Sequence, residues 1–148
     1  LAIYFYKSYQ QQLEVGKTLQ AEQQKLGTQL EQLQEHLAIL SAPDIVRVSL
    51  AGTKGRESNL VTLYWEPQTK NVYLITNKLP QAPQGYQYQL WALVNGKPVD
   101  AGLLNNCENL CLLKPVQEAQ AFAITLEKAG GSPVPSLDQL FVMGNVKS

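Results

Sequence analysis

The sequence predicts a mostly β protein, a β-sandwich or open barrel of about seven antiparallel strands, preceded by a long amino-terminal α-helix with coiled-coil character. Residues 7–41 are rich in Gln, Glu, Lys and Leu and contain no proline, which is typical of a helix. After Pro43, strand-forming residues dominate and turn residues recur at short intervals. Short strands with frequent turns and no helical period favour a sandwich or barrel.

The leucines of the expected helix follow a heptad spacing. Their intervals of seven, four, three, four and three residues place them in one narrow stripe. This leucine seam consists of Leu19, Leu26, Leu30, Leu33, Leu37 and Leu40. Gly16 and Gln23 occupy two further seam positions, so the amino-terminal half is weaker. The helix is expected to stop near Pro43, because proline disfavours helical geometry in the residue before it.

Two arrangements account for the leucine seam. Two copies of the helix bury their leucines against each other, or a single helix packs on its own β domain or on a partner. A stripe of two residues per heptad favours a pair of helices. His36, the only histidine, flanks the seam and is interpreted as a solvated or rim residue, because the sequence offers no partners for a metal or proton relay.

Aromatic residues cluster around a lysine at the amino end of the chain. They are Tyr4, Phe5, Tyr6 and Tyr9, around Lys7. The apolar run 1–6 is far shorter than the roughly 20 residues that span a bilayer, but aromatics beside lysine are typical of a membrane–water boundary. We therefore interpret the run as the last turns of a transmembrane helix. The first residue is not Met, so the chain is expected to be part of a longer protein. The alternative is an ordinary amphipathic helix start.

Seven later segments have strand character, and segments rich in turn residues separate most of them. The expected strands are 45–50, 60–65, 72–76, 86–94, 98–104, 121–127 and 140–144. Asn95-Gly96 is a strong signal for a type I′ turn, so the strands on either side of it should form a hairpin.

Alternation along two of these strands predicts which faces are buried. In 86–94, the even-numbered residues are expected to face the core. Gln89 and Trp91 then lie on the opposite face, with Trp91 beneath a loop. In the sixth expected strand, the apolar even-numbered residues point inward, whereas Thr125 and Glu127 are expected to point outward.

Composition and charge exclude several classes of function. The formal net charge is zero and the basic residues are dispersed, so the sequence offers no basic stripe for nucleic acid. Two cysteines are too few for a disulfide scaffold or a cysteine-only zinc site. Neither cysteine has an imidazole near it in sequence, and the carboxylates show no paired pattern. We therefore expect no catalytic residue, no cofactor and no metal site.

Cys107 and Cys111 form a Cys-x3-Cys pair, which is not the Cys-x2-Cys of redox or zinc motifs. If the segment makes a helical turn, the Cα atoms are about 6 Å apart, within the range of a disulfide. An oxidising compartment favours that structural disulfide. Two free thiols and a redox-sensing pair are the alternatives.

The glycines after the sixth expected strand predict a tight corner. Gly130 and Gly131 are followed by Ser132, and such a corner requires positive φ at a glycine. The segment lacks the lysine of a phosphate-binding loop and the spacing of a dinucleotide fingerprint. From the Glu-x-x-Gly-Gly-Ser spacing, we expect Glu127 to accept hydrogen bonds from the amides of 130–132 and so to lock the corner.

Several separated motifs in the second half of the chain occur in a distinctive order. Their residues are Tyr88, Gln89, Leu90, Trp91, Gly96, Pro98, Ala101, Gly102, Thr125, Glu127, Gly130, Gly131, Ser132 and Pro135. This order resembles the extracytoplasmic C-terminal domain of anti-sigma factors of the anti-sigma-K type.

The resemblance implies a non-catalytic regulatory domain outside the bacterial inner or plasma membrane. It implies a membrane partner through a single transmembrane helix, and a sigma factor bound by a cytoplasmic segment, both outside this sequence. Membrane-associated proteases would release the sigma factor by regulated proteolysis. Residues 1–42 would then be a juxtamembrane coiled-coil stalk, and 43–148 the extracytoplasmic β domain.

The expected helix departs from the family pattern, in which the β domain follows the transmembrane helix closely. Its roughly 35 residues predict a stalk of about 50 Å that either dimerises or folds back on the β domain. The alternative function is a carbohydrate-binding or adhesion module on a coiled-coil stalk. Exposed Trp65, Tyr73 or Trp91 would then stack on sugars.

Overall fold

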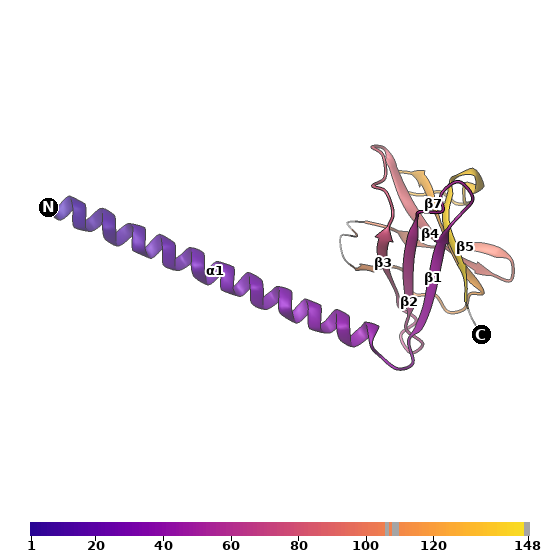
Figure 1. The fold of residues 1–148 in the computed structure, drawn as a ribbon, viewed down its shortest axis with the longest axis horizontal. Coiled ribbons are helices and arrows are strands. Elements are labelled where there is room, and N and C mark those ends of the chain that lie inside the picture. Colours follow the sequence, from indigo (N-terminus) through magenta and orange to yellow (C-terminus); the bar gives the residue numbers. More distant parts are fainter. Residues whose placement is uncertain (106, 108–109, 147–148) are drawn as a thin grey trace. The chain divides into compact units, whose positions relative to one another are not determined.

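The computed structural model describes residues 1–105, 107 and 110–146 and divides the chain into two compact units, 1–41 and 42–148. The first unit is the helix α1 (Ala2–Leu40), about 58 Å long at 1.5 Å per residue (Figure 1). It ends where proline was expected to stop it. Ser41 caps it, because both its amide, at 2.9 Å, and its hydroxyl, at 2.5 Å, donate to the carbonyl oxygen of Leu37.

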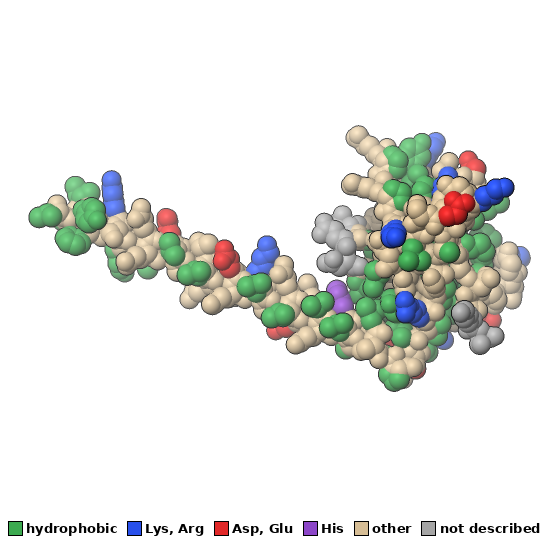
Figure 2. All heavy atoms as spheres, viewed as in Figure 1, with side chains coloured by type: hydrophobic (Ala, Val, Ile, Leu, Met, Phe, Trp, Pro, Cys, Tyr) green, Lys and Arg blue, Asp and Glu red, His purple; other side chains and the backbone are tan. Residues whose placement is uncertain are grey.

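No side chain of α1 is buried. The seam residues Leu19, Leu26, Leu30, Leu33 and Leu37 are each more than half exposed. Within the described residues, no helix is both long and apolar enough to cross a membrane. Figure 2 shows hydrophobic side chains gathered at the amino end of the helix and repeated along it.

The described residues of the second unit form a single sheet of eight antiparallel strands that curls into a half-barrel (Figure 1). The strands are β1 (Val46–Gly52), β2 (Leu60–Trp65), β3 (Val72–Lys78), β4 (Tyr86–Val94), β5 (Lys97–Leu103), β6 (Cys111–Leu112), β7 (Ala121–Lys128) and β8 (Leu140–Asn145). They are arranged in the order β5-β4-β7-β8-β1-β2-β3-β6. The predicted fold class is therefore confirmed, in its open-barrel form. The sequence analysis missed β6, which is only two residues long.

The chain that follows β6 connects the two edges of the curled sheet. The amide of Leu113 donates to the carbonyl oxygen of Val72 on β3 at 2.9 Å, and the next amide, Lys114, donates to Ala101 on β5 at 3.0 Å. Gly102 has φ +117°, and a Cβ there would lie 3.0 Å from Leu113 Cδ1. Glycine therefore lets this segment approach β5 closely.

The turn between β4 and β5 has the predicted form, because Asn95 and Gly96 have φ of 53° and 80°.

The barrel interior holds the hydrophobic core, which includes Leu90 of β4 and Phe122 of β7. The face prediction for β4 is confirmed over most of the strand. It is wrong for Tyr86, which is 48% exposed because it begins the strand at the barrel end.

Gly144 of β8 lies against β1. A Cβ at this position would be 2.2 Å from the carbonyl oxygen of Ser49, and backbone atoms cannot yield as a flexible side chain can. Gly144→Ala should therefore destabilise the β unit by about 1–3 kcal/mol, which thermal unfolding followed by near-ultraviolet circular dichroism measures. Met143→Ala, on the neighbouring exposed side chain, should cost less than about 1 kcal/mol. Equal effects of the two substitutions would contradict this close packing.

Candidate functional site

A second layer of buried side chains lies on the outer face of β4 and β7. Thr125 is fully buried and Glu127 is 3% exposed, although both were expected to be outward-facing surface residues. Their direction is as predicted, but the chain after β7 covers them. The same is true of Trp91, which is 1% exposed. Polar groups removed from water in this way require hydrogen-bond partners.

A continuous set of hydrogen bonds supplies those partners. The indole N–H of Trp91 donates to Thr125 Oγ1 at 2.8 Å, and the Thr125 hydroxyl donates to Glu127 Oε2 at 2.5 Å. Ser136 binds the same carboxylate twice, through its amide to Oε2 at 2.8 Å and its hydroxyl to Oε1 at 2.6 Å. We call these four residues the Glu127 clamp. It fastens Ser136 to β7 and, through Trp91, to β4.

Two opposing effects set the pKa of Glu127. Burial is the largest and raises the pKa, but hydrogen bonds from the Ser136 hydroxyl, the Thr125 hydroxyl and the Ser136 amide together outweigh it. The pKa is therefore held below its ordinary value of 4.5. The carboxylate is ionised at neutral pH, and hydrogen-bond donors stabilise its charge.

The expected contact between Glu127 and the glycine corner is wrong. The amide of Gly130 donates to Gln87 Oε1 at 3.2 Å, and that of Ser132 to Gln89 Oε1 at 2.9 Å. Gln87 is the cross-strand neighbour of Glu127, and its amide oxygen accepts the corner hydrogen bond that was expected for the carboxylate. Glu127 instead holds the far end of the same loop.

The corner itself has the predicted backbone. Gly130 and Gly131 have φ of 95° and 87°, which is the left-handed region that favours glycine. A Cβ on Gly131 would also lie 2.9 Å from Leu103 Cδ2 and 3.1 Å from Gln89 Oε1. The positive φ therefore favours glycine at 131, and a side chain there would also displace the ends of Leu103 and Gln89.

Gln89 connects the corner to the edge of the barrel. Its Nε2 donates to Asp100 Oδ1 at 2.9 Å and to the carbonyl oxygen of Ser132 at 3.1 Å. Asp100 also accepts the Gly102 amide at 3.0 Å and the Lys114 ammonium at 2.7 Å. Burial raises the pKa of Asp100, but the hydrogen bonds from Lys114, Gly102 and Gln89 and the charge of Lys114 together lower it.

The structure thus brings Gln89, Trp91, Thr125, Glu127 and the glycine corner together from separate motifs. Gly96 and Pro98 belong to the β4–β5 hairpin instead. The sequence analysis missed Gln87, Asp100, Lys114 and Ser136. Only Asp100 carried a signal, since it directly precedes the motif Ala101-Gly102.

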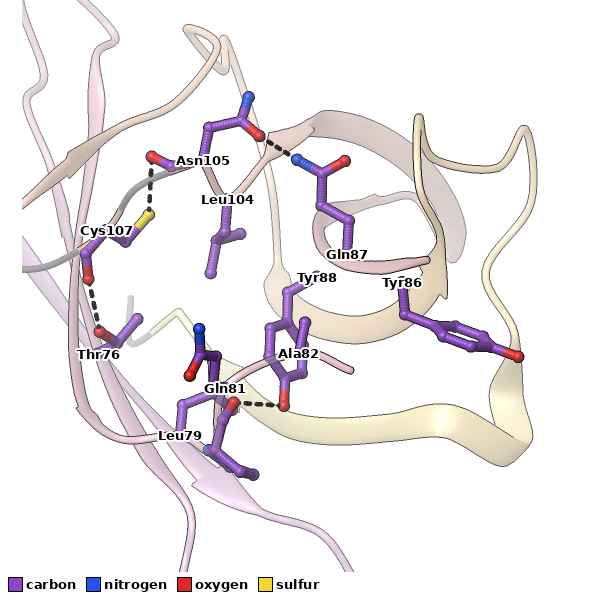
Figure 3. A pocket seen from close by; sticks show the side chains of 11 residues that line it. Thr76, Leu79, Gln81, Ala82, Tyr86, Gln87, Tyr88, Leu104, Asn105 and Cys107 are labelled. Carbon is purple, nitrogen blue, oxygen red and sulfur yellow. Dashed lines mark hydrogen bonds between the residues drawn. The ribbon is translucent and has the colours of Figure 1, made fainter. Parts of the chain in front are cut away.

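A pocket of about 530 Å³ opens at the end of the barrel where β4 begins. Its walls are Thr76, Leu79, Pro80, Gln81, Ala82, Tyr86, Gln87, Tyr88, Leu104, Asn105 and Cys107. In Figure 3, Gln87 and Asn105 meet on one side and Leu79, Gln81 and Ala82 lie on the other, with Leu104 and Tyr88 between. We call it the barrel-mouth pocket.

Hydrogen bonds fix the walls of the barrel-mouth pocket. The Tyr88 hydroxyl donates to the carbonyl oxygen of Pro80 at 2.8 Å, and the Thr76 hydroxyl to that of Cys107 at 3.3 Å. The Gln87 amide donates to Asn105 Oδ1. Burial raises the pKa of the Tyr88 hydroxyl, against a smaller opposite effect of the charge of Arg56.

The predicted cysteine pair lies between the end of β5 and the start of β6. Cys107 and Cys111 are joined, with Cα atoms 5.1 Å apart. Cys111 begins β6, while the helical turn expected between the cysteines lies partly outside the described residues. The oxidation state in the cell stays a prediction.

The aromatic residues expected to stack on sugars are not exposed. Trp91 and Tyr73 are buried. Trp65 is partly buried, packs edge to face on Phe122, and donates its indole N–H to the carbonyl oxygen of Val116 at 2.9 Å. That prediction is wrong, because all three rings are buried or partly buried.

The fold and the outer network define an all-β domain on a helix, in which the Glu127 clamp fixes a loop. The described residues hold no group of three or more side chains suited to a metal ion. Asp100, a second carboxylate of this network, is paired with Lys114. The contacts of Glu127 and Asp100 account for the stability of the outer face and for the position of the loop that follows β7.

Comparison with known proteins adds the family. The family model "Anti-sigma-K factor rskA, C-terminal" matches residues 11–139. A Streptomyces griseus protein described as an uncharacterized protein in the phr 5' region is 34% identical over 121 residues, covering 79% of this chain. The chain spans 50% of that protein's length. No solved structure shows a significant match. The chain belongs to the family of anti-sigma-K factor C-terminal domains, which are regulatory.

Replacing Glu127 tests the clamp. Glu127→Gln presents an amide N–H₂ to donors from Ser136, so it should lower the free energy of unfolding by about 1–3 kcal/mol at neutral pH. The measurement is urea denaturation. Glu118→Gln removes the same charge from an exposed residue and serves as the control. If the two variants unfold at the same urea concentration, the clamp does not stabilise the domain.

The same pair of variants has a definite pH dependence. Because the folded pKa of Glu127 is lowered, its contribution is complete above the ordinary pKa of 4.5 and is lost as the pH falls through the folded pKa. The wild type should therefore lose stability in acid more steeply than Glu127→Gln. The pKa of Asp100 is also lowered in the folded state, so the Glu127→Gln variant should keep part of the acid dependence of stability. Parallel pH–stability curves would contradict the lowered pKa.

Proposed function

We propose that the chain is the extracytoplasmic, non-catalytic regulatory domain of a membrane-anchored anti-sigma factor. The observation that carries the proposal is the family match, which covers most of α1 as well as β1 to β7. Because the match begins inside α1, most of the helix lies within the family region. The expected departure from the family pattern is therefore smaller than the sequence analysis supposed.

In this proposal, α1 is a juxtamembrane stalk whose amino end lies at the membrane surface. The exposed aromatic rings at that end support it, since Tyr4, Phe5 and Tyr6 are each about two-thirds exposed or more. A transmembrane helix and a sigma-binding cytoplasmic segment would precede residue 1. Membrane-associated proteases would cut near the membrane and free the sigma factor, and the stalk would control their access.

The charge pattern of α1 supports self-association through the leucine seam. The helix has seven charged residues, of which only Glu22 flanks the seam. The others lie on the outer positions of the heptad, where a partner helix does not reach: Lys7, Glu14, Lys17, Lys25, Glu31 and Glu35. Two parallel copies therefore bury leucines without facing like charges. Isolated helices gain most of their stability from such packing.

Polar substitution of the seam tests the dimer. Leu30→Gln with Leu33→Gln removes four leucines from a pair of helices, at about 2 kcal/mol or more each. Light scattering should show that the wild-type chain is a dimer and the variant a monomer at the same concentration. Ala21→Gln with Thr28→Gln changes outer positions and should leave the dimer intact. A wild-type monomer would contradict pairing and favour packing on the β unit.

Membrane topology and cleavage test the proposed function itself. In the full-length protein, alkaline phosphatase fused after residue 148 should be active, because that enzyme folds only outside the cytoplasm. Leu30→Gln with Leu33→Gln should speed cleavage near the membrane by several-fold, measured by immunoblot after synthesis is stopped, whereas the Ala21 and Thr28 substitutions should not. An inactive fusion would rule out the extracytoplasmic placement. Unchanged cleavage would remove the stalk from the control of proteolysis.

A further inference from the structure

The barrel-mouth pocket has the dimensions of a small-molecule site. Its volume of about 530 Å³ lies within the range of about 300–1,000 Å³ typical of ligand pockets, and barrel mouths are a common location for them. None of the residues described as lining it carries a formal charge at neutral pH. Within the described part of the chain, the pocket therefore offers no charge partner to a phosphate, a carboxylate or a metal cation.

The polar groups of the pocket are mainly side-chain amides and hydroxyls. Gln81, Gln87 and Asn105 contribute amides, each of which both donates and accepts hydrogen bonds. Tyr86 also lines the pocket, but its ring is 48% exposed and points away from the other lining side chains (Figure 3). Leu79 and Leu104 provide apolar wall between these groups (Figure 3).

We infer that the barrel-mouth pocket binds a neutral saccharide of one or two sugar units. Sugar hydroxyls both donate and accept hydrogen bonds, so they match amide side chains in either direction. The apolar face of a sugar ring suits Leu79 and Leu104. These are different residues from the buried aromatics of the sugar-binding alternative, and they lie at the end of the barrel.

A peptide that adds a strand to β4 is a poorer occupant, because β4 has no free edge at Gln87 and Tyr88. On one side, Gln87 and Tyr88 pair with Glu127 and Leu126 of β7. On the other side, the carbonyl oxygen of Tyr88 already accepts the Leu104 amide at 3.0 Å. Peptides that add a strand to a sheet require unpaired backbone groups. At this strand, recognition depends on side chains, which favours a sugar.

Gln87 connects the pocket to the glycine corner. Its Nε2 faces Asn105 in the pocket wall, while its Oε1 accepts the Gly130 amide at 3.2 Å. A sugar that competes for the Gln87 and Asn105 amides therefore acts on a side chain that also holds the corner. This deepens the proposed function, on which it rests, by giving the regulatory domain a neutral sugar as its signal.

The test is nuclear magnetic resonance titration of the 148-residue chain with glucose, galactose, mannose, N-acetylglucosamine, cellobiose and maltose. At least one sugar should shift the side-chain amide signals of Gln81, Gln87 and Asn105 in a saturable way. It should also shift the backbone amide of Gly130. Asn105→Ala should weaken that sugar about tenfold, whereas Asn145→Ala, an exposed asparagine of β8, should not.

Each other result overturns the inference. These results are no saturable shift with any sugar, equal affinity of the Asn105→Ala chain, or saturation by neutral tripeptides such as Gly-Gly-Gly in place of sugars. Gln81→Ala provides a second variant, which should lose affinity while the melting temperature stays unchanged, since this lining side chain is exposed. Binding is measured without a membrane, so failure here leaves the topology result of the proposed function untouched, and the reverse holds.

Discussion

The outer face of this domain depends on one buried carboxylate. Glu127 is ionised and almost wholly removed from water, and hydrogen bonds from Ser136 and Thr125 compensate for its charge. One carboxylate oxygen accepts a hydrogen bond from the Thr125 hydroxyl, and the oxygen of that hydroxyl accepts one from the indole N–H of Trp91. The charge is therefore connected to the centre of β4 and β7. The loop from the glycine corner to η1 (Leu137–Gln139) therefore has a fixed path over the sheet.

Amide side chains extend this constraint in both directions along β4. Gln87 holds Gly130 and faces Asn105 in the barrel-mouth pocket, and Gln89 holds Ser132 and contacts Asp100. The Asp100–Lys114 ion pair then reaches the segment that joins the edges of the sheet. Because this ion pair is exposed to solvent, it adds little to the free energy of unfolding by itself. The pair matters through its position, because neighbouring side chains of β4 connect the corner, the pocket and the edge of the sheet.

Much of the fold follows from local pattern, and what the sequence analysis missed comes from tertiary contact. The helix, its end before Pro43 and the Asn95-Gly96 turn are encoded in short windows, and they were predicted. β6 was missed because its two residues pair only through β3. Glu127 was recognised as important, but its partner was wrong, because Ser136 reaches it only after the loop folds back. Alternation gave the direction of Thr125 and could not show the loop that covers it.

The most direct test of this account is the pKa of Glu127, measured from the carboxyl carbon chemical shift of the folded chain during an acid titration. The account predicts a midpoint below the ordinary value of 4.5, with the Ser136 amide shifting at the same pH. A midpoint at or above 4.5, or a Ser136 amide that ignores the titration, would contradict the claim that this carboxylate organises the outer face.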